Sequence, residues 1–335
     1  MKIMFVHKDI NQDVNAGGIN TVYLKHIEQL QDENDIYVIT SRDGEWNLKA
    51  KRFIVSSDKQ KRKNEMEKII EEVQPDIIDV FSWGAELLDF VKKEHNSKVI
   101  MRADIPMRYY DREPIDEEMA KYCDKVISIS NWCDFEWSSI FGSKTTVIPH
   151  ATDMVKSKEI NKKKNTVVWV GKSTYIKGFD LLFKLPDEFF KKYSLTIVCA
   201  PTKFNNPVLF QKLKDRGVIF KENLSNEDYR KLLLESEYVL STARKEGFCI
   251  AVLEAMRLGC IPVIPYWIGG TTDFVNNENG IIYSNFNECF EKMNKLTKED
   301  KITKINNAIK QTDIYNWKYV VELSKKIYEE LYNEC

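Results

Sequence analysis

Residues 239–264 read VLSTARKEGFCIAVLEAMRLGCIPVI, and this stretch decides the fold. An apolar run ends at Leu240, a loop of small and charged residues follows, and a helical pattern begins at Ile250 before a second apolar run. This order of strand, loop, helix and strand predicts a βαβ unit with parallel strands. The loop contains Glu246, and Glu254 follows in the first turns of the helix.

The same alternation of strand and helix patterns extends outward in both directions. Toward the N-terminus, β-branched runs such as KIMFVH (2–7) and DIYVIT (35–40) alternate with helical segments such as INTVYLKHIEQLQ (19–31). The alternation restarts after the polar segment Ser157–Asn165, and the chain closes with helices only, from Asn287 to Glu334. We therefore expect an α/β fold of two doubly wound, Rossmann-like domains facing a cleft.

Composition excludes several classes of protein. The 335 residues include 17 Phe, 15 Tyr and 7 Trp, which supply enough apolar surface to exclude a disordered chain. The net charge of -1 predicts no nucleic-acid partner. No apolar run approaches the roughly 18 residues that a membrane helix needs, and the opening MKIMFVHKD lacks the long apolar region of a signal peptide.

Cysteine and histidine usage bears on compartment and metal binding. The seven cysteines form no CxxC pair and lie mostly in apolar runs, which indicates reduced, buried thiols in a cytoplasmic protein. The four histidines are isolated from one another, so the spacing of a zinc site is absent. We expect no metal and no other cofactor.

One dense basic run, Lys59, Lys61, Arg62 and Lys63, precedes the helical pattern EMEKIIEEV. The residues favour a solvated helix start, and a contact with a membrane surface or an anionic acceptor is the alternative. The sequence leaves both interpretations open.

A second motif supports a phosphate-binding site beside the two glutamates. The segment VVWVGKSTYIKGFDLLFKL (167–185) places Lys172 at a strand end and Lys177 just before a helix. Ligands of parallel sheets bind at the carboxyl ends of the strands, where both lysines would meet an anion. The residues Gly247–Ile250 bring backbone N–H groups to a helix N-terminus, which also favours a diphosphate. A solvated loop lysine and a glutamate that merely favours the helix dipole are the structural alternatives.

Together these motifs resemble the retaining glycosyltransferases of the family 4 type, also called glycosyl transferases group 1. The most specific marks are EGFCIAVLEAMRLGCIPVI, VGKSTYIKGFDLL and IGGTTDFVNNENGIIY, and NAGGI, ISISNW, IPHATD and IYNWKYVVELSKKIYEELY are weaker ones. The resemblance implies a GT-B fold. Its parts would be an acceptor-binding domain (1–155), a nucleotide-sugar-binding domain (156–312) and a C-terminal helix (313–335) that packs back on the first domain.

The resemblance also implies roles for the two glutamates and two lysines. Glu254 would bind the ribose of the sugar nucleotide, and Glu246 would contact the donor sugar near the reaction centre. Lys172 stands where the family usually has arginine, and with the catalytic Lys177 it would neutralise the diphosphate.

Backbone groups and glycines complete the implied donor site. The amides of Phe248, Cys249 and Ile250 would hold the phosphate and sugar. Gly17 and Gly18 would let a loop after the first strand approach the donor phosphates, and an ordinary flexible turn is the alternative for that pair.

The sequence departs from the family pattern at several places. Many members carry His-Asp at the end of the fifth N-terminal strand, where this chain has Arg102 and Asp104 in MRADIPMR. Asp104 is kept as a candidate catalytic residue, and whether the pair replaces the family histidine is open. Cys249 replaces a usual glycine, which adds a side chain near the sugar and would narrow the choice of donor.

The implied activity is transfer of a sugar from a nucleotide-diphosphate donor to an acceptor hydroxyl with retention, by a hexosyltransferase-type enzyme. UDP-sugar is the expected donor by frequency alone, and the acceptor is unspecified. No pair of aspartates is separated by one residue, so helix dipole and lysines would replace a divalent ion. The alternatives are a non-catalytic GT-B subunit that binds a partner transferase or a glycan, and a GT-B phosphorylase or epimerase. We expect a cytoplasmic protein, with peripheral contact at the inner membrane face as the alternative.

Overall fold

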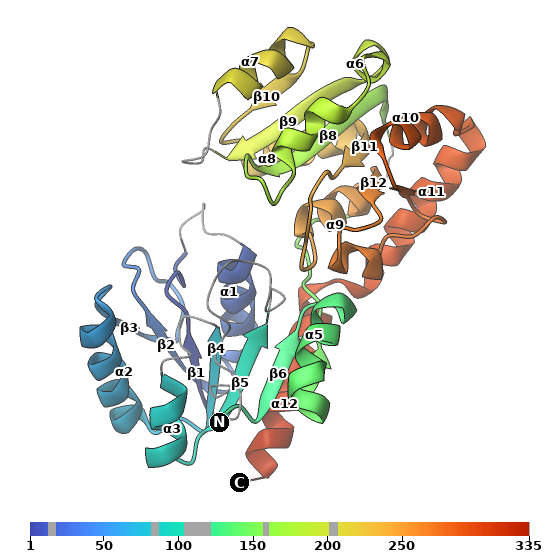
Figure 1. Ribbon diagram of the computed structural model, residues 1–335. Coiled ribbons are helices and arrows are strands. Elements are labelled where there is room, and N and C mark those ends of the chain that lie inside the picture. The colour runs from blue at the N-terminus through green and yellow to red at the C-terminus, as the bar shows by residue number, and fades with distance from the viewer. Residues whose placement is uncertain (13–17, 82–86, 104–121, 157–160, 201–206, 335) are drawn as a thin grey trace. The chain divides into compact units, whose positions relative to one another are not determined.

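The computed structural model describes residues 1–12, 18–81, 87–103, 122–156, 161–200 and 207–334 (Figure 1). The chain forms two compact units. The first unit consists of Met1–His150 together with Trp317–Cys335, and the second unit consists of Ala151–Asn316. The first unit is therefore assembled from both ends of the chain.

The first unit is built on a parallel sheet with the strand order β3-β2-β1-β4-β5-β6-β7. Its strands are β1 (Lys2–Val6), β2 (Asp35–Thr40), β3 (Lys51–Ile54), β4 (Ile77–Phe81), β5 (Lys98–Ala103), β6 (Lys125–Ser128) and β7 (Thr145–Val147). Its helices are α1 (Gly18–Leu30), α2 (Lys59–Val73), α3 (Leu88–Glu94), α5 (Asn131–Phe141), the 3₁₀ helix η2 (Gly142–Lys144) and α12 (Trp317–Asn333). Central strands such as β1 and β4 are apolar runs rather than alternating patterns, because helices cover both faces of a parallel sheet.

The second unit repeats this plan, with a six-stranded parallel sheet in the order β10-β9-β8-β11-β12-β13. Its strands are β8 (Lys163–Lys172), β9 (Ser194–Ala200), β10 (Ile219–Lys221), β11 (Ser236–Leu240), β12 (Ile261–Pro265) and β13 (Ile281–Tyr283). Its α-helices are α6 (Asp187–Lys192), α7 (Pro207–Asp215), α8 (Asn226–Glu235), α9 (Ile250–Arg257), α10 (Phe286–Lys295) and α11 (Lys298–Gln311), and its 3₁₀ helices are η3 (Phe179–Lys184), η4 (Gly270–Asp273) and η5 (Thr312–Ile314).

Two parallel sheets with interleaved helices confirm the predicted α/β class. In the second sheet the direction of strand order reverses between β8 and β11, which are hydrogen-bonded neighbours. The crevice outside the carboxyl ends of strands at such a reversal is where open α/β sheets bind ligands. The fold therefore directs attention to the loops that follow β8 and β11.

Some local predictions were wrong in detail. The helix expected from Phe179 is the 3₁₀ helix η3, followed by the short helix α6. The helix α7, which begins with Pro207, was not predicted. The strand β8 begins at Lys163, inside the polar segment Ser157–Asn165, because Lys163 pairs with Ser236 of the neighbouring strand β11.

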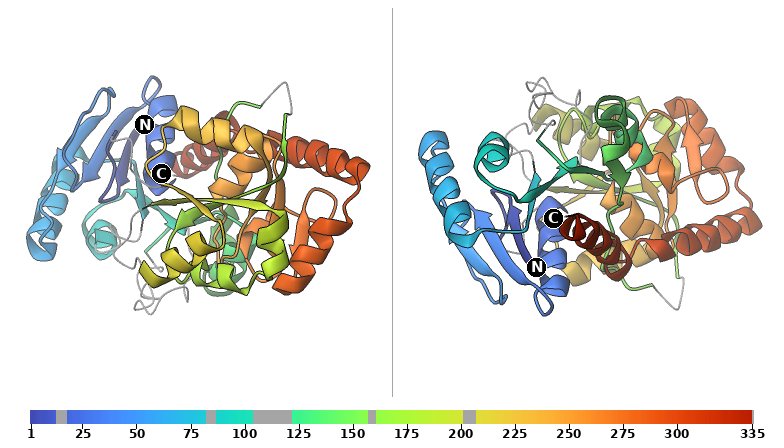
Figure 2. Two further views of the ribbon diagram at one scale, coloured as in Figure 1. Left: turned by 90° about the horizontal axis from the view of Figure 1, so that it is seen from above. Right: turned by 90° about the horizontal axis from the view of Figure 1, so that it is seen from below.

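The C-terminal helix α12 packs against α1 and β4 of the first unit (Figure 2). A buried network of polar side chains holds α12 against the first unit. The Arg102 Nε atom lies 3.0 Å from both carboxylate oxygens of Asp79, and the Tyr328 hydroxyl donates to Asp79 Oδ2 over 2.7 Å. The His26 ring on α1 also contacts the Ser324 hydroxyl on α12 at 2.8 Å. Because buried polar groups need partners, these contacts fix how the last helix docks.

In the part of the chain that the structure describes, no helix combines the length and the apolar character needed to cross a membrane.

Candidate active site

The centre of the candidate site is an ion pair between Lys177 and Glu246. The Lys177 Nζ atom lies 2.6 Å from Glu246 Oε1 and 2.8 Å from Oε2. Lys177 follows β8, and Glu246 follows β11. Since these strands are neighbours at the reversal of strand order, their carboxyl-terminal loops meet where a ligand is expected. The structure thus brings together the two residues predicted to act on the donor sugar and the diphosphate.

Backbone contacts hold Glu246 in place. Its N–H donates to the Ile268 carbonyl over 2.7 Å, and its carbonyl accepts from Gly270 N–H over 2.9 Å, as in a one-residue parallel bridge with Gly269. Glu246 is only 7% exposed, so Lys177 supplies the charge partner that a buried carboxylate requires. The IGGTTDF segment therefore holds the Glu246 backbone, and Lys177 pairs with its carboxylate.

The loop that carries Lys177 is fixed by a close approach to the loop after β11. Gly178 has φ of +66°, and a Cβ atom there would lie 1.9 Å from the Thr242 carbonyl oxygen. The Thr242 hydroxyl donates to the Gly178 carbonyl over 2.8 Å. Arg244 then forms a two-pronged ion pair with Asp180, with both N···O distances at 2.7 Å. Only glycine permits this packing at position 178.

The α9 N-terminus lies next to the ion pair, and its N-cap is a strained cysteine. Cys249 has φ of +73° and ψ of +72°, a left-handed conformation that costs a non-glycine residue free energy. Burial and the nearby Glu246 carboxylate raise the pKa of the Cys249 thiol, so the thiol stays protonated. The preceding Phe248 packs against Phe274 and Tyr315. Ile250 is the first residue of the helix.

Glu254 lies within α9, beside the helix α8. The Tyr229 hydroxyl donates to Glu254 Oε2 over 3.0 Å. Burial raises the pKa of Glu254 to about 7; the Tyr229 hydrogen bond opposes this shift, and the Asp153 carboxylate adds to it. The side chain therefore gains and loses a proton near neutral pH, which is unusual for a glutamate.

The remaining predicted site residues are Lys172, Gly18, Gly17 and Asp104. Lys172 is the exposed last residue of β8, and Gly18 begins α1 in the first unit. Gly17 and Asp104 lie outside the described residues. Arg102 is buried against Asp79 and Tyr328, which assigns it to the core of the first unit rather than to an exposed site.

Three features of the site were not anticipated from the sequence. They are the Tyr229 partner of Glu254, the Arg244–Asp180 ion pair, and the bridge from Glu246 to Gly269. The glycine pair in IGGTTDF and the arginine in STARKEG were visible signals for two of them. Tyr229 carried no such signal, because it reaches the site from a different helix.

Among the described residues, no cluster of three or more His, Cys, Asp or Glu side chains is arranged to hold a metal ion. The cation paired with Glu246 in the candidate site is the ammonium group of Lys177.

Comparison with known proteins finds a family match within this unit. Residues 151–312 match the model of the family described as Glycosyl transferases group 1. The matched residues lie within the second unit and make up just under half of the chain. A human relative, one of the subunits of phosphatidylinositol N-acetylglucosaminyltransferase, is 26% identical over 202 residues. The match covers 56% of this chain and 41% of the human protein, so it spans less than half of that relative.

Solved structures of low sequence identity share the fold over nearly the whole chain. A sucrose-phosphate synthase from Thermosynechococcus elongatus superposes with a TM-score of 0.84 at 13% identity, with 100% of both chains covered. Anabaena HepE in complex with UDP-glucose gives 0.77 at 15% identity, with 98% of this chain and 100% of HepE covered. The fold is therefore the GT-B fold of glycosyltransferases.

Proposed function

We propose that the protein transfers a sugar from a nucleotide-diphosphate-sugar donor to an acceptor hydroxyl, with retention of anomeric configuration. The observation that carries this proposal is the Lys177–Glu246 pair at the strand-order reversal of a glycosyl transferases group 1 domain. A buried carboxylate held beside a partly exposed ammonium suits a reaction in which positive charge grows on the sugar and negative charge grows on the leaving group.

In this proposal the α9 region binds the donor. Glu254 accepts hydrogen bonds from ribose hydroxyls, and Lys172 and the amides of Phe248, Cys249 and Ile250 receive the diphosphate. The end of β8 and the start of α9 supply these groups. The positive end of the helix dipole adds to the attraction for phosphate.

The reacting groups follow from the ion pair. As the bond from the anomeric carbon to the diphosphate oxygen breaks, the ammonium of Lys177 stabilises the charge on the departing diphosphate. Glu246 stabilises the sugar as it becomes cationic. The acceptor oxygen forms its bond on the same face of the sugar, and its proton passes to the leaving diphosphate. The contact of Glu246 with the sugar strengthens in the transition state, which is where it lowers the barrier.

We further propose a UDP-sugar donor and no metal requirement. The HepE structure is a complex with UDP-glucose, and the human relative is named for transfer of an N-acetylglucosaminyl group. Lys177, Lys172 and the α9 dipole would carry the charge compensation that other transferases assign to a divalent ion. The acceptor-binding role falls to the first unit, and the reduced thiols favour a cytoplasmic protein.

A non-catalytic subunit is the second candidate, because the human relative is named as one subunit of a transferase. Nucleotide binding followed by donor hydrolysis separates the two. A screen of UDP-, GDP- and ADP-sugars should reveal one donor that is bound and slowly hydrolysed. Binding without any turnover, in the presence of candidate acceptors, would favour the non-catalytic role.

The Glu246→Gln variant tests the catalytic assignment directly. We expect kcat to fall on the order of 100-fold, because the amide cannot stabilise a cationic sugar as the carboxylate does, while UDP affinity stays within about twofold. Glu237→Gln is the matched control, since Glu237 is also buried and paired with a lysine, Lys301 at 2.8 Å. Full turnover in Glu246→Gln, or an equal loss in the control, would contradict the role.

A further inference from the structure

The first unit has a pocket that is lined by its own residues. Its volume is about 460 Å³, within the roughly 300–1,000 Å³ range of small-molecule sites. The residues that line it are Lys8, Asp9, Ser41, Arg42, Ser57 and Arg62. They come from the segments that follow β1, β2 and β3, at the carboxyl edge of the sheet.

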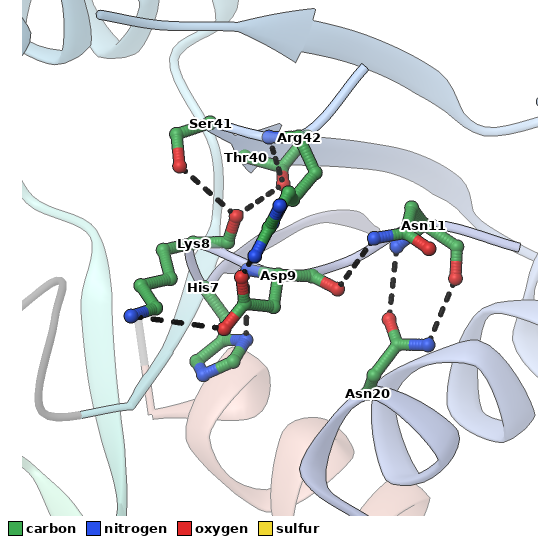
Figure 3. A network of polar contacts seen from close by, with 8 residues as sticks. All are labelled: His7, Lys8, Asp9, Asn11, Asn20, Thr40, Ser41 and Arg42. Carbon is green, nitrogen blue, oxygen red and sulfur yellow. Dashed lines mark hydrogen bonds and ion pairs between the residues drawn. The ribbon is translucent and has the colours of Figure 1, made fainter. Parts of the chain in front are cut away.

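Hydrogen bonds between and beside these segments hold the pocket in shape before a ligand binds (Figure 3). The Lys8 carbonyl accepts hydrogen bonds from the Thr40 hydroxyl at 2.9 Å and from the Ser41 hydroxyl at 3.1 Å. The Asn11 backbone N–H donates to Asn20 Oδ1, and the Asn20 amide donates back to the Asn11 carbonyl. The loop that carries Lys8 and Asp9 is therefore held on both sides before any ligand arrives.

The charge of the pocket is strongly positive. Arg42 Nε lies 2.9 Å from Asp9 Oδ1, and Lys8 Nζ lies 3.9 Å from Asp9 Oδ2. Arg62 is only 9% exposed, and its Nη1 atom donates to the Ser57 carbonyl over 3.0 Å. The lining residues thus include three cations and one carboxylate, an excess of two positive charges. A phosphate monoester carries about -1.5 to -2 at neutral pH, which matches this excess.

We propose that this pocket binds the phosphate group of a small hydroxylated ligand. The three cations receive the phosphate, the Ser57 hydroxyl donates to it, and Asp9 accepts a hydrogen bond from a hydroxyl of the ligand. The ligand is a soluble sugar phosphate or the phosphate headgroup of a lipid. The proposal also makes this ligand the acceptor of the sugar, and that part rests on the proposed transferase function.

The basic run at 59–63 contributes one residue to this pocket. Its member Arg62 lines the pocket, while Lys61 and Lys63 form surface pairs with Glu65 and Glu67, one turn further along α2. Asp58 caps the helix by accepting from Lys61 N–H at 3.0 Å. The run is a helix start, as the sequence favoured, and one of its cations also serves the pocket.

Binding of inorganic phosphate and of glucose 6-phosphate to the full chain, measured by isothermal titration calorimetry, tests the proposal. We expect saturable binding that Arg42→Gln weakens on the order of 10-fold, as the loss of one charge-assisted hydrogen bond predicts. Arg62→Lys keeps the buried charge but loses the planar guanidinium group, which can donate two hydrogen bonds to one phosphate. This variant should also weaken binding. Lys68→Gln removes one charge from an exposed position on the same helix and is the control, with an expected change under about twofold.

In the proposed function the second unit also receives phosphate groups, at Lys172 and the start of α9, so Lys172→Gln distinguishes the two sites. Phosphate binding that Arg42→Gln reduces and Lys172→Gln preserves supports the pocket. The same affinity in wild type, Arg42→Gln and Arg62→Lys, or no saturable binding, overturns it. Loss of UDP binding is a separate result, which bears only on the proposed transferase. Phosphatidylcholine vesicles with and without phosphatidic acid are then compared as competitors. This comparison decides between a lipid headgroup and a soluble ligand.

Discussion

At the scale of single residues, the proposed role of Glu254 in ribose binding would link nucleotide binding to pH. Its pKa of about 7 means that the side chain is mostly protonated at pH 6 and mostly ionised at pH 8. In the proposed site the ribose hydroxyls donate hydrogen bonds to the ionised form, so UDP affinity should rise with pH by roughly tenfold across this window. Titration of UDP at several pH values measures this.

The Glu254→Gln variant isolates that effect. The amide does not titrate, so whatever pH dependence survives belongs to the diphosphate of UDP or to other groups. Tyr229 and Asp153 influence the Glu254 carboxyl and remain unchanged in the variant. Identical pH profiles for wild type and Glu254→Gln would remove Glu254 from the ribose site.

Cys249 provides a test of backbone strain. Glycine adopts φ of +73° without steric cost, whereas alanine keeps the Cβ atom that makes this conformation unfavourable. Cys249→Gly should therefore be more stable than Cys249→Ala by about 1 kcal/mol in urea unfolding. Because both variants lose the thiol, the difference reports on the backbone alone. Equal stability of the two variants would show that the surroundings relax to accept the Cβ atom.

At this scale, some of the residue pairs that form the candidate site could be predicted from the sequence and others could not. Glu246 and Lys177 were found because each lies in a recognisable segment at the end of an apolar run, and parallel topology then requires those ends to meet. The partner of Glu254 could not be found in this way. Tyr229 lies on another helix, and only three-dimensional packing brings its hydroxyl to the carboxylate.

At the scale of elements, strands were easier to predict than short helices. Buried parallel strands read as apolar β-branched runs, and the runs at 2–7 and 35–40 became β1 and β2. The segment after Gly178 has a helical apolar pattern, yet it forms a 3₁₀ turn followed by the separate helix α6 at Asp187. Pro186 lies between them as the α6 N-cap and cannot continue the ladder of hydrogen bonds.

The turn between β8 and η3 yields a prediction at this scale. Gly178→Ala would place a Cβ atom 1.9 Å from the Thr242 carbonyl oxygen, so the loops after β8 and β11 must separate. We expect a loss of about 2–4 kcal/mol in stability together with a fall in activity, because the Lys177–Glu246 distance changes. Denaturant unfolding and a turnover assay measure both quantities.

Gly217→Ala is the control for that variant. Gly217 lies in the same unit with φ of +82° and has open space where its Cβ atom would be. It should cost only the left-handed conformation, about 1 kcal/mol, with turnover unchanged. If the two glycine variants cost the same, the close approach to Thr242 is not what requires glycine at position 178.

At the scale of the whole molecule, the proposed charge compensation predicts that turnover survives excess EDTA. The lysine side chains and the α9 N-terminus are part of the chain, so a chelator cannot remove them. A turnover assay with and without EDTA checks this, with Mg²⁺ and Mn²⁺ added back in turn. Activity that vanishes in EDTA and returns with either ion would refute the assignment.

The division of the chain into a split first unit and a continuous second unit sets an order of events on the ribosome. Residues 1–150 emerge first, but Asp79 and Arg102 meet Tyr328 only when the last helix has been made. At about 5–20 residues per second, synthesis of residues 151–316 takes on the order of ten seconds or more. During that interval the nascent first unit exposes the surface that α12 later covers. The second unit, although it begins later, is the first to have its whole sequence outside the exit tunnel.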